Sequence, residues 1–145
     1  MTNSRSHLAL PDGIFFLLLA AVLLAAGPCS KELAGPVAQG EWGGDRVGLT
    51  VSATGGTLQY GCASGTIDQR IVAGTDGRFA VMGTHTKGHG GPVFQNEIPD
   101  RHPATYAGWT DGETLTLTIT LTDTGERLGS YSVSRGQPAR ITRCL

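Results

Sequence analysis

The sequence has little charge and no motif of a catalytic centre. Only 16% of the 145 residues are charged, and 11 Lys and Arg are balanced by 12 Asp and Glu. Such a chain has no large field of one sign with which to attract a nucleic acid. No G-x-S-x-G motif marks a nucleophilic serine, and no C-x-x-C or Cys/His cluster has the spacing of a zinc site. These absences predict a non-enzymatic protein that needs no cofactor and does not bind nucleic acid.

Long apolar runs are also scarce. The one strong run, residues 14–26, is shorter than the ~20 residues that a helix needs to cross a bilayer. Its length is typical of the apolar region of a signal peptide. Arg5 is the only fixed cation among the side chains before it, and Asp12 lies just before the run, separated from it by Gly13. We expect residues 1–29 to be an export signal.

The junction after this run leaves two outcomes open. Residues 25–29, Ala-Ala-Gly-Pro-Cys, resemble the lipobox of bacterial lipoproteins, in which a small apolar tripeptide precedes the lipidated cysteine. Pro28 departs from that pattern, because its fixed φ and missing N–H are awkward beside a cleaved bond. Either Cys29 is lipidated, or ordinary cleavage follows Gly27 or Cys29. In both cases we expect a protein exported from the bacterial cytoplasm, as a periplasmic or membrane-anchored lipoprotein or a secreted protein, that touches the membrane only through its signal or a lipid anchor.

The chain has three cysteines, and the fate of Cys29 decides how they can pair. If Cys29 is acylated or removed with the signal, Cys62 and Cys144 remain as an even pair. In an oxidising compartment such a pair favours a disulfide over two free thiols. We therefore expect a Cys62–Cys144 disulfide in the mature protein.

Glycine, by contrast, is abundant: the chain has 22, more than double average usage, which indicates tight turns. After a flexible Gly/Pro/Ala linker at residues 30–40, residues 41–145 form one predicted β domain without helical periodicity. The clearest strand alternates leucine or isoleucine with threonine over residues 114–122, a pattern typical of a half-buried strand. The other predicted strands span residues 47–51, 58–62, 65–67, 77–83, 104–109, 128–134 and 140–145.

Seven or eight short strands, each with one apolar face, predict an all-β fold. An antiparallel up-and-down meander that closes into a small barrel buries those faces and removes exposed edges. A two-sheet sandwich is the alternative, but nearly every link reads as a hairpin, such as Asp111-Gly112. In such a meander the strands that carry Cys62 and Cys144 finish at the same end of the barrel.

The segment Gly40-Glu41-Trp42 resembles the Gly-x-Trp that opens the first strand of lipocalins. The resemblance is one of architecture over residues 40–145, and it implies a lipocalin-like (calycin-type) barrel whose closed end is plugged by Trp42. It further implies that Arg140 or Arg143 stacks on this indole by a cation–π contact. Small lipocalin-like envelope lipoproteins and the barrel-shaped bacterial inhibitors of metalloproteases are similar in size.

The candidate binding region is the connection formed by residues 84–103. It is rich in glycine and proline and holds three of the four histidines: His85, His89 and His102. Structureless connections of ~15 residues or more inside a compact domain are usually functional or disordered. We expect a monomeric binding or accessory module that contacts a protein partner or small ligand through loops at the barrel mouth.

Two other functions stay open. The three loop histidines are weak candidates for ligands to a zinc or copper ion, with Glu97 or Asp100 completing the shell. The spacing of His85 and His89 is weak evidence for a metal site, because no helix is predicted there that would place both side chains on one face. Alternatively, the arm at residues 30–40 inserts into the cleft of a protease and makes the protein an inhibitor.

Overall fold

The computed structural model describes residues 34–142 and 144. The predicted signal, Cys29 and Arg143 lie outside these residues. The strands are β1 (Gly35–Pro36), β2 (Gly40–Gly44), β3 (Val47–Val51), β4 (Gly56–Tyr60), β5 (Ala63–Ile67), β6 (Val72–Ala73), β7 (Arg78–Lys87), β8 (Asp100–Thr110), β9 (Thr114–Leu121) and β10 (Arg127–Arg135). The described part of the chain contains no helix of the length and apolarity needed to cross a membrane.

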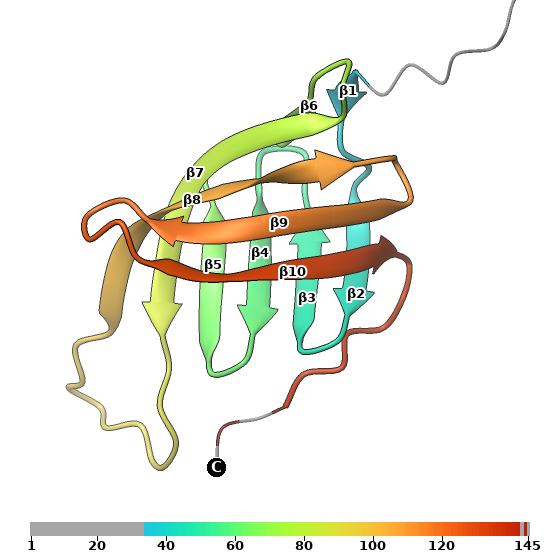
Figure 1. Ribbon diagram of the computed structural model, residues 1–145. Helices are drawn as coiled ribbons and strands as arrows, with labels where there is room; N and C mark the ends of the chain where they lie inside the picture. Colours follow the sequence, from blue (N-terminus) through green and yellow to red (C-terminus); the bar gives the residue numbers. More distant parts are fainter. Residues whose placement is uncertain (1–33, 143, 145) are drawn as a thin grey trace, which may run out of the picture. The chain divides into compact units, whose positions relative to one another are not determined.

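Eight of these strands close into an antiparallel barrel, which confirms the predicted fold (Figure 1). The order around the barrel is β2-β3-β4-β5-β7-β8-β9-β10, and β10 returns to pair with β2. Strands that are consecutive in this order are joined by turns or short connections, so the topology is a meander rather than the alternative sandwich. The small strands β1 and β6 pair with each other outside this barrel sheet.

The alternation in β9 explains why the barrel holds its register. Leu115, Leu117, Ile119 and Leu121 are buried, whereas the threonines between them are exposed or half-buried. A slip of one residue against β8 or β10 would turn this whole apolar set toward water. The leucine–threonine pattern therefore fixes both the face and the pairing of the strand.

The chain that leads into β2, together with the paired strands β1 and β6, lies at the top of the barrel in Figure 1. Trp42 is 1% exposed, and its Nε1 donates a hydrogen bond to the Ala38 carbonyl oxygen at 3.0 Å. The Val37 N–H donates to the Ile71 carbonyl oxygen at 2.9 Å, and both of these side chains are buried. The described part of the expected linker is thus packed against the barrel.

The C-terminal segment differs from the expected final strand. Residues 136–142 form no strand; they run back over the outer side of β2 and β3. Gly43 and Gly48 are cross-strand partners there. Because neither has a side chain, the tail can pack directly against the backbone of the two strands. A Cβ on Gly43 would lie 2.2 Å from the Gln137 carbonyl oxygen, and one on Gly48 would lie 2.8 Å from the Ala139 Cβ. The two glycines are therefore needed for the close approach of the tail.

Arg140 lies in this tail, and its placement corrects the expected stacking on Trp42. Its N–H donates to the Gly44 carbonyl oxygen at 3.0 Å, and its own carbonyl oxygen accepts from the Arg46 N–H at 2.8 Å. Its side chain is exposed, and among the described residues no cation–π contact joins an arginine to the buried indole. Because Arg140 pairs with the β2–β3 turn from outside, its side chain does not plug the barrel.

The tail brings Cys144 to the turn after β4, where Cys62 lies. The two Cα atoms are 5.4 Å apart across a sequence separation of 82 residues, and the sulfurs lie at disulfide distance. The two cysteines do meet at one end of the barrel, as expected. They meet because the tail crosses the outer wall, and not because two barrel strands lean together.

Candidate functional site at the barrel mouth

The expected loop at residues 84–103 is shorter in the structure. β7 continues to Lys87 and β8 begins at Asp100, with Lys87 and Asp100 as cross-strand partners. The connection proper is residues 88–99. His85 and His102 therefore stand on strands, directly opposite each other, and only His89 belongs to the loop.

A pocket of about 390 Å³ opens at this end of the barrel. β10 pairs with β2 only through Ser134↔Gly43 and Arg135↔Trp42. Residues 127–133 of β10 consequently pair with β9 alone, which leaves room between this half of β10 and the turn after β4. The pocket is lined by apolar and aromatic side chains, among them Tyr60, Ala63, His85, Leu121, Leu128 and Tyr131.

A buried tyrosine–histidine pair lies in this pocket. His85 is 5% exposed, and its Nδ1 lies 2.5 Å from the Tyr60 hydroxyl. The Tyr60 ring also contacts the Tyr131 ring, with centroids 5.3 Å apart. Among the described residues, Nε2 of His85 has no hydrogen-bond partner. Every fully buried side-chain nitrogen or oxygen in this part of the chain has a partner, so Nε2 is not fully buried. This nitrogen is therefore accessible to a ligand.

Burial keeps this pair uncharged. It lowers the pKa of His85 below its usual value of 6.5, and the nearby His102 lowers it further. Burial also raises the pKa of the Tyr60 hydroxyl far above its ordinary range. At neutral pH the pocket thus presents a neutral imidazole and a neutral phenol, a combination that suits an uncharged hydrogen-bonding group.

The rim of the pocket, in contrast, is charged. His102 Nδ1 lies 2.6 Å from Asp123 Oδ2, and its Nε2 lies 3.0 Å from Asp100 Oδ1. The hydrogen bond to Asp123 raises the pKa of His102 and lowers the pKa of the Asp123 carboxyl. Lys87 and Glu126 also line the opening. The rim therefore carries both signs of charge around an apolar interior.

His89 lies apart from the other two histidines. Its Nε2 pairs with Glu97 Oε1 across the loop, and Glu97 Oε2 accepts a hydrogen bond from the Phe94 N–H at 3.3 Å. Glu97 and the carbonyl oxygen of Gly90 raise the pKa of His89. Among the residues that the structure describes, no group of three or more His, Cys, Asp or Glu could hold a metal ion. The geometry therefore gives no support to the metal alternative.

Four pocket residues were not singled out by sequence: Tyr60, Leu121, Leu128 and Tyr131. The period-two pattern places Tyr60 and Leu121 on the buried side of their strands. It cannot show that β4 and β10 face each other across the mouth, because that proximity depends on closure of the whole barrel. The only available signal was an aromatic residue on each of two separate strands, Tyr60 at the end of β4 and Tyr131 in the middle of β10.

The His102–Asp123 pair makes stability depend on pH in a defined window. The raised pKa of His102 contributes stability that is present below pH 6.5 and is lost as the pH rises through the raised value. The lowered pKa of Asp123 contributes stability that is present above pH 3.8 and is lost as the pH falls through the lowered value. Between these limits, His102→Gln should lower the thermal unfolding midpoint, and at alkaline pH the difference should shrink.

Thermal unfolding followed by circular dichroism across this range tests the pair. Asp123→Asn should lower the midpoint less, because His102 keeps its partner Asp100, and the double variant should lose no more than His102→Gln alone. A midpoint difference that stays constant from acid to alkaline pH would show that the two side chains are not coupled by charge.

The mouth thus combines an apolar interior, a neutral Tyr60–His85 pair and a rim of mixed charge. These features lie in a barrel whose core includes the buried Trp42. No family model matches the chain, and comparisons with curated proteins and with solved structures also yield no match.

Proposed function

We propose that this protein is a non-enzymatic binding module whose mouth pocket takes a small, largely apolar molecule with one uncharged hydrogen-bonding group. The observation that carries this proposal is the pocket of about 390 Å³ at the mouth. A water molecule occupies about 30 Å³, so the pocket is far larger than a few solvent molecules need. It lies within the range of small-molecule sites.

The lining chemistry selects the kind of ligand. Leu121, Leu128 and the Tyr131 ring supply apolar contact area, and His85 Nε2 supplies a polar group at the buried wall. A charged ligand group placed against the neutral Tyr60–His85 pair would lose its hydration without a compensating charge. The occupant should therefore be neutral where it is buried and polar only where it reaches the rim.

The predicted export and the lipocalin-like kinship belong to the same proposal. An eight-stranded closed barrel with a buried tryptophan on its first strand supports that kinship. A cysteine pair at disulfide distance supports folding outside the reducing cytoplasm. The loop at residues 88–99 borders the mouth and exposes Val93, Phe94 and Ile98, which supports a contact with a protein partner beside the pocket.

Titration with the fluorescent probe 1-anilinonaphthalene-8-sulfonate tests the pocket. One saturable site per chain is expected at neutral pH. Leu128→Trp fills the pocket from β10 and should abolish this binding. Ser130→Trp adds the same side chain at an exposed position of the same strand, and should leave binding within about twofold.

The comparison of these two variants decides between the pocket and a non-specific apolar surface. If Leu128→Trp binds the probe as well as the unaltered protein, the mouth pocket is not the site. If Ser130→Trp abolishes binding while the thermal midpoint is unchanged, the probe occupies the outer wall instead. Either result would overturn the proposal.

A further inference from the structure

The outer wall formed by β7, β8, β9 and β10 carries a second, separate surface. Cross-strand pairing aligns its outward residues into three rows that cross all four strands. The rows are Arg78–Trp109–Thr116–Ser132, Ala80–Ala107–Thr118–Ser130 and Met82–Thr105–Thr120–Arg127. The middle row consists only of small residues, so it is a trough between two taller rows.

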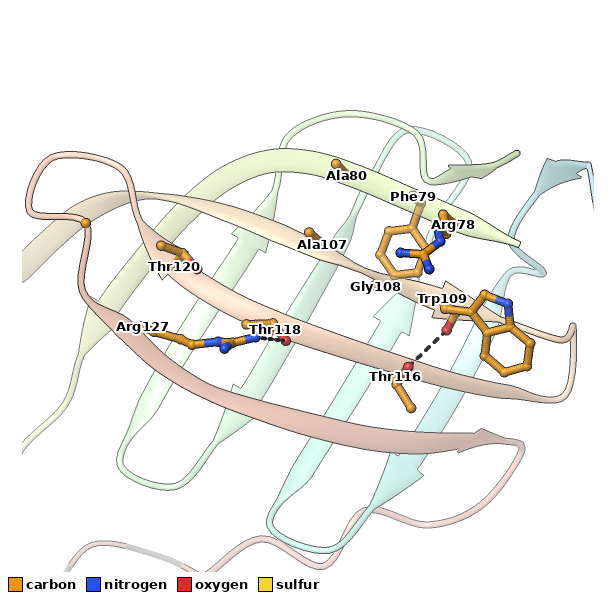
Figure 2. A pocket seen from close by; sticks show the side chains of 11 residues that line it. Arg78, Phe79, Ala80, Ala107, Gly108, Trp109, Thr116, Thr118, Thr120 and Arg127 are labelled. Carbon is orange, nitrogen blue, oxygen red and sulfur yellow. Dashed lines mark hydrogen bonds between the residues drawn. The ribbon is translucent and has the colours of Figure 1, made fainter. Parts of the chain in front are cut away.

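A broad, open groove of about 990 Å³ follows this trough. Figure 2 shows Trp109 and Arg78 near one end of the groove, and the Arg127 side chain extending toward Thr118 near the other. β7 and β10 are separated by three strand spacings, which is about 14 Å. The groove therefore has the dimensions of a site for an extended ligand, in contrast to the pocket at the mouth.

Trp109 is a fixed apolar platform in this groove. The residue is 40% exposed, and its Nε1 donates a hydrogen bond to the Asp76 carbonyl oxygen at 2.9 Å. The hydrogen bond holds the indole in place while a face stays open to solvent. Exposed tryptophans of this kind are enriched at binding surfaces, because the ring offers a large contact area at low entropic cost.

The charge of the groove is entirely positive. Its eleven lining residues include Arg78 and Arg127 and no acidic side chain. Arg78 Nε lies 3.5 Å from Asp76 Oδ2 in an exposed pair, which contributes little stability and leaves the guanidinium accessible. Arg127 forms no ion pair among the described residues, and its Nη2 donates to Thr118 Oγ1 at 3.4 Å. This local charge contrasts with a net charge of −1 for the whole chain.

We propose that this groove binds an acidic oligosaccharide, that is, a short chain of sugars that carry carboxylates. The C–H face of a sugar ring stacks on the Trp109 indole, and its hydroxyls exchange hydrogen bonds with the Thr116, Thr118 and Thr120 hydroxyls. Arg78 and Arg127, at opposite corners of the rows, each receive a carboxylate, which a guanidinium binds through two parallel hydrogen bonds.

The same residues disfavour a single-stranded nucleic acid. Proteins that bind such strands place successive bases on several aromatic rings. Here Trp109 is the only exposed aromatic ring in the lining, because Phe79 is buried. The hydroxyl-rich floor instead matches a ligand with many hydroxyls of its own.

Isothermal titration calorimetry with tri-galacturonic acid tests the proposal, with neutral cellotriose as the matched control ligand. Saturable binding of the acidic trisaccharide is expected, and it should weaken as salt is added. Trp109→Ala should weaken binding at least about tenfold, and Arg127→Gln about three- to tenfold. Arg101→Gln removes an exposed arginine of β8 outside the groove, and should leave the affinity unchanged.

Ala107→Glu provides a second test that keeps Trp109 in place. It puts a carboxylate in the trough and should abolish binding of the acidic sugar while the thermal midpoint changes little. The proposal is overturned if cellotriose binds equally well, or if Arg101→Gln weakens binding as much as Arg127→Gln. It is also overturned if a thymidine oligonucleotide or oligoglutamate binds more tightly, or if no trisaccharide binds. Probe binding at the mouth, measured in the same Ala107→Glu protein, should persist and thereby separates this site from the pocket.

Discussion

Replacing Trp42 by alanine is expected to lower the free energy of unfolding by about 3–5 kcal/mol. The indole is 1% exposed in the core and its Nε1 is bonded to the Ala38 carbonyl oxygen. The substitution removes the largest buried side chain, opens a cavity among its neighbours and leaves that carbonyl without its partner. Urea unfolding followed by circular dichroism measures the loss directly.

Trp109→Ala is the matched control for this experiment, because it truncates the same side chain at a 40% exposed position. We expect it to cost much less than Trp42→Ala. Trp42→Phe should recover part of the loss, because the smaller ring still fills much of the space. Equal destabilisation by the two alanine variants would contradict a structural role for Trp42 in the core.

Loss of the link between Cys62 and Cys144 is expected to cost about 2–5 kcal/mol. The link spans 82 residues, so it restricts a large part of the unfolded chain and also ties the tail to the turn after β4. Cys62→Ser, Cys144→Ser and the double variant should be destabilised to the same extent. Urea unfolding of protein recovered from an oxidising compartment provides the measurement.

Two controls accompany this comparison. Adding a reductant to the unaltered protein should lower its stability to that of the double serine variant, and the same reductant should leave that variant unchanged. Intact-mass analysis after thiol alkylation should find no free thiol at either position. Alkylation of both cysteines in the folded, oxidised protein would refute the disulfide.

The barrel strands could be predicted because their alternation is clear. Leucine and isoleucine alternate with threonine along β9, and Asp111-Gly112 marks the turn before it. Residues 84–87 of β7 escaped prediction because the last inward residues of this strand are Gly83 and His85. A small or polar residue on the buried side hides the period of two, so a paired strand resembles a polar loop.

The tail shows the opposite error. Ile141 and Cys144 follow a glycine–proline turn and resemble the apolar positions of a last strand. Ile141 instead packs over the outer side of β2 and β3, where Gly43 and Gly48 make space, and Cys144 lies beside Cys62. The mouth pocket escaped prediction for a related reason. Tyr60 and Tyr131 are brought together only by closure of the barrel, and local sequence patterns contain no record of such distant neighbours.

The narrow pairing between β10 and β2 has a consequence for self-association. Two residue pairs close this junction, whereas ten join β7 to β8. Separation at the junction would convert the barrel into a curved sheet with two unpaired edges, and such edges readily pair with those of another copy. The tail overlies β2, and its Cys144 lies at disulfide distance from Cys62. A closed disulfide would hold this tail over β2, and would thus oppose separation of β2 from β10 and exchange of strands between molecules.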